Sequence, residues 1–215
     1  MEELSPEEQR VLGALVEKGQ TSPEQYPLTL NALVAACNQA SSRAPVVAYG
    51  PSTVEAAVAL LRQRGLARQV LASGNRATKY RHVLDEALGL TAGECAVLAV
   101  LFLRGPQTAS ELRARTERYH PLDDLGGVVG VLDRLATRYA EPYVRRLDRT
   151  AGQREERWAQ LMGGEPCDPG PGPVTAGRRP SAGDRLSALA GEVADLRAEV
   201  EGLRAEVDEL RLRAR

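Results

Sequence analysis

Aromatic residues, lysine and cysteine are all scarce in this chain, and each scarcity narrows what the protein can be. Aromatic side chains make up 4% of the 215 residues, so any core must be built mainly from leucine, valine and alanine, which favours helices. Apolar residues still reach 43%, which is enough for packed cores. The formal net charge is −1, so total charge indicates no class of partner.

Cysteine spacing and the absence of targeting signals bear on the compartment. Cys37, Cys95 and Cys167 are too far apart in sequence to suggest a disulfide framework or a paired metal-binding motif. The N-terminus is acidic, unlike a signal peptide, and the longest apolar run, residues 95–103, is too short to span a bilayer. The sequence therefore predicts a cytoplasmic protein with no membrane segment.

Motifs for catalysis are also missing. The two histidines, His82 and His120, are distant in sequence, and no phosphate-binding glycine loop, nucleophile elbow or zinc-protease motif is present. Cys37 and Cys95 fall on apolar faces of expected helices, where packing in the core is the commoner role. We expect no enzymatic activity, no cofactor and no metal.

Residues 1–88 carry helix signals followed by a hairpin signal. Residues 5–8 (SPEE) have the pattern of a capped helix start, with serine before proline and glutamate three positions after the cap. Pro27 opens a second expected helix, and Ser52 caps a third. Two short runs within residues 66–83 flank a Ser-Gly-Asn turn, which predicts a β-hairpin.

Residues 89–163 repeat this order. Thr91 and Thr108 each precede an expected helix, a third helix is expected over 123–136, and residues 143–161 predict a second hairpin. Three helices and a hairpin, twice over, is the order of two winged-helix units in tandem. The predicted fold is mainly α with small β-hairpins, with two winged-helix domains followed by a coiled-coil helix.

A heptad pattern closes the chain. A linker rich in glycine and proline, residues 164–183, precedes residues 184–215, where apolar side chains recur at steps of three and four. Valine at most a positions with leucine at d favours a two-stranded coiled coil. The predicted dimer contacts are Leu186, Leu189, Val193, Leu196, Val200, Leu203, Val207 and Leu210.

Charges beside this apolar seam predict the direction of pairing. Glutamates occupy g positions and arginines the following e positions in three heptads: Glu192 and Arg197, Glu199 and Arg204, Glu206 and Arg211. A parallel partner would place unlike charges together, and an antiparallel one would oppose like charges. We predict a parallel homodimer; the alternative is a single amphipathic helix packed on its own domains.

The basic residues of the first 88 positions are concentrated at the third helix and the hairpin. No acidic residue lies between Ala56 and Leu84, although several arginines and a lysine do. In a winged helix, the third helix enters the major groove and the wing follows the phosphate backbone. The predicted DNA contacts are Ser52, Thr53, Arg62, Gln63 and Arg64 from the helix, and Arg68, Arg76, Lys79 and Arg81 from the hairpin.

Other interpretations of this surface stay open. It can be a solvated basic face that balances the acidic first helix, and Glu55 with several alanines makes the third helix a poor reader of base edges. The second hairpin suits phosphate less, because acids are interleaved with its arginines. The leading prediction is a homodimeric DNA-binding protein or transcriptional regulator; the alternative is a protein–protein adaptor without DNA binding.

Three segments resemble the YceH family of uncharacterised bacterial proteins. They are residues 17–46 (EKGQTSPEQYPLTLNALVAACNQASSRAPV), 104–122 (RGPQTASELRARTERYHPL) and 152–164 (GQREERWAQLMGG). The resemblance covers about residues 3–164 and implies two winged-helix domains in tandem, without a biochemical function. Within it, the polar residues 38–43 follow the second expected helix, where they can bind backbone groups or a ligand; a conformational role is the favoured interpretation.

Overall fold

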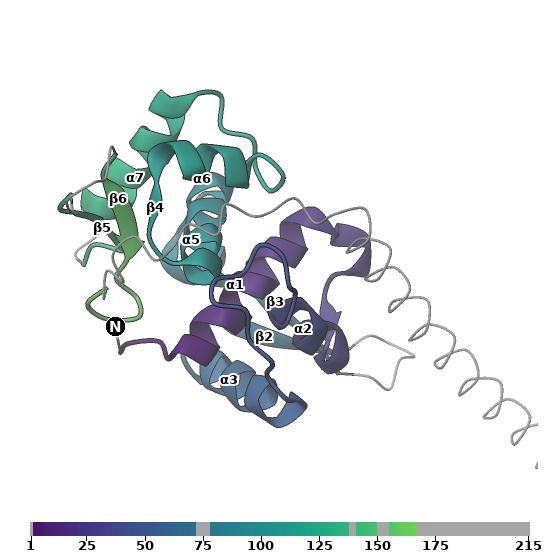
Figure 1. The fold of residues 1–215 in the computed structure, drawn as a ribbon. Helices are drawn as coiled ribbons and strands as arrows, with labels where there is room; N and C mark the ends of the chain where they lie inside the picture. Colours follow the sequence, from purple (N-terminus) through teal and green to yellow (C-terminus); the bar gives the residue numbers. More distant parts are fainter. Residues whose placement is uncertain (1, 72–77, 138–140, 150–154, 167–215) are drawn as a thin grey trace, which may run out of the picture. The chain divides into compact units, whose positions relative to one another are not determined.

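The computed structural model describes residues 2–71, 78–137, 141–149 and 155–166, which are mainly helical with small antiparallel sheets (Figure 1). The predicted coiled coil at 184–215, with its dimer contacts, lies outside the described residues. So do the predicted DNA contact Arg76 and the turns of both hairpins. No helix in the described part of the chain is both long and apolar enough to cross a bilayer.

The first helix, α1 (Pro6–Thr21), begins as the sequence predicts. The Ser5 hydroxyl accepts a hydrogen bond from the Glu8 backbone N–H, and the Glu8 carboxylate accepts one from the Ser5 N–H, which forms a capping box. The elements that follow in residues 2–88 are the 3₁₀ turn Pro23–Gln25, β1 (Leu28–Thr29), α2 (Leu30–Cys37), α3 (Pro51–Gln63), β2 (Ala67–Leu71), β3 (Thr78–His82) and α4 (Leu84–Leu88).

The predicted start of the second helix is wrong by three residues. Instead of opening at Pro27, α2 begins at Leu30 and is capped by the Thr29 hydroxyl, which accepts a hydrogen bond from the Ala32 N–H. Leu28 and Thr29 are drawn into strand β1 by pairing with β3. Pairing across the sheet therefore overrides the local helix-start signal of the proline.

The predicted cap of the third helix is also wrong. Helix α3 starts at Pro51, with Gly50 as its N-cap, so Ser52 lies inside the first turn. Proline is well suited to the first helical position, because its fixed φ matches the helix. A backbone N–H at this position would have no partner within the helix, so proline loses nothing by lacking one. The proline signal at residue 51 decides the boundary ahead of the serine.

Residues 89–166 contain the same kinds of element in the same order. Thr91 and Thr108 cap helices as predicted, each in a capping box with a glutamate three residues later. The elements are α5 (Ala92–Arg104), β4 (Gln107–Thr108), α6 (Ala109–Thr116), α7 (Leu125–Thr137), β5 (Val144–Leu147) and β6 (Arg157–Gln160).

Within the described ranges, the strands form two small sheets, here called sheet A (β1-β3-β2) and sheet B (β4-β6-β5). Each contains a hairpin that the sequence predicts and a two-residue strand that it does not. The short strands, β1 and β4, precede the second helix of their halves. Two residues cannot display an alternating pattern, so only pairing with a hairpin identifies them as strands.

Residues 2–166 lie within one compact unit, and one hydrophobic cluster contains side chains from both halves. Helices α1 and α5 pack side by side at its centre (Figure 1). They approach closely at Gly13, where an added Cβ would lie 2.9 Å from Leu103 Cγ. As composition predicts, the cluster consists mostly of leucine, valine and alanine.

Candidate functional site

The hairpin of sheet A places three of the predicted DNA contacts on one face. Arg68 and Arg81 are direct partners in the strand register, and Lys79 lies two residues from Arg81, on the same side of the pleat. Tyr80 and Ala67 point to the opposite side, where they are buried. The outward face of this hairpin, defined by Arg68, Lys79 and Arg81, is here called the cationic face.

A carboxylate from α4 lies against the cationic face. Glu86 accepts hydrogen bonds from Arg68 and Arg81, each at 2.8 Å. All three side chains are at least 37% exposed, and ion pairs of that kind contribute only about 0–1 kcal/mol. Two guanidinium groups share one carboxylate, so the face remains positive. Glu86 could not be identified from the sequence, because its position depends on how α4 follows the hairpin.

Helix α3 presents a mixed surface. Arg62 and Gln63 are exposed in its last turn, whereas Ser52 is exposed and Thr53 half-buried in its first turn. Leu60 on the same helix is 43% exposed. The helix thus offers one predicted cation and a few polar groups to a partner, rather than a row of side chains suited to reading bases.

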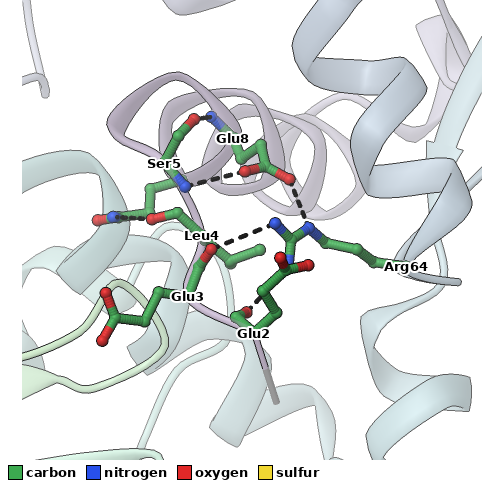
Figure 2. A network of polar contacts seen from close by, with 7 residues as sticks. Glu2, Glu3, Leu4, Ser5, Glu8 and Arg64 are labelled. Carbon is green, nitrogen blue, oxygen red and sulfur yellow. Dashed lines mark hydrogen bonds and ion pairs between the residues drawn. The ribbon is translucent and has the colours of Figure 1, made fainter.

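Arg64 is separated from the other predicted DNA contacts. Figure 2 shows its guanidinium reaching the segment before α1, where Nε donates to Glu8 Oε1 at 2.8 Å. Its other nitrogens donate to the backbone oxygens of Glu2 at 2.9 Å and Glu3 at 3.2 Å. The Glu8 side chain is 2% exposed. Arg64 therefore holds the N-terminal segment against the end of α3.

The second half presents a different surface. A groove of about 870 Å³ lies among α6, α7 and sheet B, and it is here called the α7 groove. Leu125 and Val129, one turn apart on α7, line it and are 44% and 38% exposed, and Trp158 of β6 also lines it. Exposed apolar side chains gathered in a concave surface are typical of protein-binding sites.

Arginines around the α7 groove are matched by acids. Arg146 pairs with Glu156 at 3.0 Å, Arg149 approaches the same carboxylate at 3.8 Å, and Arg145 pairs with Glu165. This pairing agrees with the interleaved charges seen in the sequence. It leaves less unbalanced positive charge than on the cationic face.

Cys37 and Cys95 are packed in the interior, and His82 is half-buried. Burial raises the pKa of the Cys37 and Cys95 thiols to about 12, so neither is a ready nucleophile near neutral pH. The His82 ring packs near Tyr26, and its Nδ1 is 3.6 Å from Asp85; burial lowers the pKa of His82. Over the described ranges, no cluster of three or more metal-ligating side chains is found.

Asn38 and Arg43, at the two ends of residues 38–43, bind backbone groups, as the conformational interpretation predicts for these two side chains. Asn38 donates to the Tyr49 carbonyl at 2.9 Å and accepts from the Tyr49 N–H at 2.8 Å. Arg43 donates to the Ala36 carbonyl through Nε and Nη2, and pairs with Glu17 at 2.5 Å. Arg43 is buried, whereas Ala40 and Ser41 are exposed, so the loop is fixed to the interior through its last side chain.

Comparisons with other proteins identify relatives of this chain over about three quarters of its length. Residues 4–153 match the family described as protein of unknown function, DUF480. A UPF0502 protein of Pelobacter propionicus is 53% identical over 162 residues, which covers 75% of this chain and 73% of that protein. A second, from Geobacter sulfurreducens, is 50% identical over 163 residues, covering 76% and 74%. A third, from Pseudomonas aeruginosa, is 49% identical over 162 residues, covering 75% and 71%. This chain belongs to the DUF480 family, which includes the UPF0502 proteins of bacteria.

Proposed function

We propose that the protein is a homodimer of tandem winged-helix domains that binds DNA through its N-terminal half. The observation that carries this proposal is the cationic face, where the strand register brings Arg68, Lys79 and Arg81 to one side of sheet A. Exposed Arg62, near the end of α3, adds a fourth cation shortly before β2 begins.

The winged-helix assignment rests on the order and pairing of the elements. In each half, a helix is followed by a short strand, two more helices and a hairpin. In each sheet, the short strand pairs with the second strand of the hairpin, as β1 does with β3 and β4 with β6. This arrangement leaves the third helix and the hairpin next to each other in the chain, as a DNA-binding wing requires.

Contact with phosphates is the mode of binding that these residues favour. Arginine and lysine on a strand face can neutralise backbone phosphates without reading sequence. The exposed part of α3, with Glu55 and Leu60, has little capacity to hydrogen-bond base edges. We therefore propose salt-dependent binding with weak sequence preference.

Fluorescence anisotropy with duplexes of unrelated sequence tests this proposal. Affinity should fall steeply between about 50 and about 200 mM salt. The double variant Arg62→Glu/Lys79→Glu should bind every duplex at least about tenfold more weakly. Arg113→Glu, an exposed position on α6, is the control for charge reversal. Absence of binding at low salt, or equal affinity for all these proteins, would overturn the proposal.

The dimer is proposed from the heptads of residues 184–215. Leu196→Glu with Leu203→Glu would place charges at two d positions, and should give a monomer in analytical ultracentrifugation. Gly202→Ala, at a c position that faces solvent in the heptad pattern, is the control and should leave the dimer intact. A double variant that stays dimeric would move the dimer contact elsewhere in the chain.

A protein–protein adaptor is the second candidate, and the α7 groove favours it. Its occupant would be a partner protein that inserts apolar side chains against Leu125 and Val129. A photo-crosslinking amino acid at position 125 should capture one discrete partner, and Val129→Asp should abolish capture. The same probe at exposed Arg118, in the segment between α6 and α7, is the control. Equal capture at both positions would argue against the groove.

A further inference from the structure

A second groove, of about 380 Å³, opens where the two halves meet, and it is here called the junction groove. Its walls come from the start of α1, the loop of residues 44–49, the end of α5 and residues 159–166. Most of the lining is apolar or aromatic: Pro6, Pro45, Tyr49, Phe102 and Pro106. The volume is that of a site for a small organic molecule.

Arg10 also lines the junction groove and is only 4% exposed. Its Nη2 donates to the Pro45 carbonyl at 2.6 Å, whereas Nη1 is buried and has no hydrogen-bond partner among the described residues. In the part of the chain that the structure describes, no carboxylate pairs with Arg10. Glu17, two turns further along α1, is paired with Arg43.

An unpaired guanidinium in such a place is costly. Burying a charge without a counter-ion, and leaving one of its N–H groups unsatisfied, both oppose folding. Burial, and then the positive charge of Arg43, lower the pKa of Arg10, which shows the same unfavourable surroundings. The guanidinium of Arg10 therefore lacks one negative counter-charge, and an apolar wall lies beside it.

We propose that the junction groove binds a small monocarboxylate with an aromatic or aliphatic body, and that Arg10 pairs with its carboxylate. Guanidinium groups recognise carboxylates through charge-assisted hydrogen bonds. One uncompensated positive charge matches a monoanion, whereas a dianion such as phosphate would leave excess negative charge in apolar surroundings. Tyr49, Phe102 and the prolines would contact the body of the ligand.

Three other polar side chains at the groove, those of Glu165, Gln9 and Gln160, are already engaged. Glu165 lines it, but its carboxylate is paired with Arg145. The amides of Gln9 and Gln160 bond to each other at 2.9 Å. Arg10 thus remains the group that lacks a partner.

The ligand would contact both halves of the protein. Loop 44–49 comes from the first half, whereas Phe102 and Pro106 come from the second. Bound ligand should therefore slow hydrogen exchange in loop 44–49. This proposal does not depend on DNA binding, and either can fail without the other.

Titration calorimetry of the full chain with benzoate, and with benzamide as its neutral match, tests the site. Benzoate should bind at least about tenfold more tightly than benzamide, because only the acid supplies the missing charge. Inorganic phosphate at the same concentration should not displace it. If neither compound binds at millimolar concentration, if both bind alike, or if phosphate displaces benzoate, the proposal is overturned and water is left as the partner of Nη1.

Two substitutions connect the binding to the groove. Arg10→Gln should remove the preference for benzoate, and should raise the melting temperature of the unliganded protein because a buried unpaired charge is gone. Val47→Glu adds a carboxylate to the groove wall and should weaken benzoate binding, whereas Val46→Glu, at a 58% exposed neighbour outside the lining, should not. If both Arg10→Gln and Val47→Glu still prefer benzoate to benzamide, benzoate binds elsewhere and the proposal is overturned. If Arg10→Gln does not fold, the result for Val47→Glu decides by itself.

Discussion

The two halves of this protein begin in the same way and end with different surfaces. In each, the first helix opens with a capping box, and the glutamate of that box pairs with an arginine from the third helix of the same half. Glu8 of α1 pairs with Arg64 at 2.8 Å, and Glu94 of α5 pairs with Arg134 at 3.2 Å. The two halves therefore share a glutamate–arginine ion pair as well as an order of helices and strands.

The outer surfaces differ because different residues occupy equivalent elements. The hairpin of sheet A carries the cationic face, with two arginines sharing Glu86. In the second half, the arginines near the hairpin are matched by acids, and α7 exposes Leu125 and Val129. The same order of helices and strands therefore carries two kinds of surface: a positively charged one in the first half and one with exposed apolar side chains in the second.

The largest single effect is expected at the two glutamate–arginine pairs. Arg64→Ala should lower the free energy of unfolding by about 3 kcal/mol, because it leaves buried Glu8 without its counter-ion and frees two backbone carbonyls. Arg134→Ala should cost less, about 2 kcal/mol. It too leaves a buried carboxylate without its counter-ion, since Glu94 is 0% exposed, but among the described residues Arg134 donates to no backbone carbonyl. Urea denaturation of the full chain measures both.

Arg113→Ala, at an exposed position of α6, is the control for loss of an arginine from a helix surface. It should change the free energy of unfolding by about 0.5 kcal/mol or less. Equal losses for Arg64→Ala and Arg134→Ala would mean that the hydrogen bonds of Arg64 to the two backbone carbonyls contribute little to stability.

Two glycines in helices should respond with opposite sign. Gly13→Ala in α1 should cost about 2 kcal/mol, because its Cβ would press on Leu103 and Phe102 of α5 at 2.9 and 3.0 Å. Gly130→Ala in α7 should gain up to about 1 kcal/mol, because alanine favours the helix and the nearest atom is 3.8 Å away. Thermal unfolding measures both, and a shared sign would contradict the tight packing of α1 on α5.

The smallest expected effect is a loss of folding stability at low pH. Burial lowers the pKa of His82 below its ordinary value of 6.5, so the unfolded chain binds a proton more readily than the folded protein. Stability should therefore fall as the pH drops through 6.5 toward the lower folded pKa. His82→Gln should reduce the loss measured between about pH 7.5 and about pH 5.5 by roughly 1 kcal/mol or less. An unchanged pH dependence would mean that other groups account for it.

Among the residues proposed to contact DNA, the shared face of the hairpin cations could be predicted from the sequence, whereas the position of Arg64 could not. Alternation along two strands places Arg68, Lys79 and Arg81 on one face, and that alternation is a local property. Arg64 ends in an ion pair with Glu8, which lies far from it in sequence, so no local pattern could reveal that contact. The surroundings of Arg10 could not be predicted for the same reason, since α1 meets three segments there that are distant in sequence.

The sequence by itself determined where three of the described helices start, because a capping box needs only a hydroxyl and a glutamate three residues later. The starts of α1, α5 and α6 follow from such signals. Tertiary structure alone decided which charges are paired and which are left alone, as with Glu8 and Arg10. Burial strengthens electrostatic interactions and removes water as a partner, so the fate of a charge depends on distant segments that meet only when the chain folds.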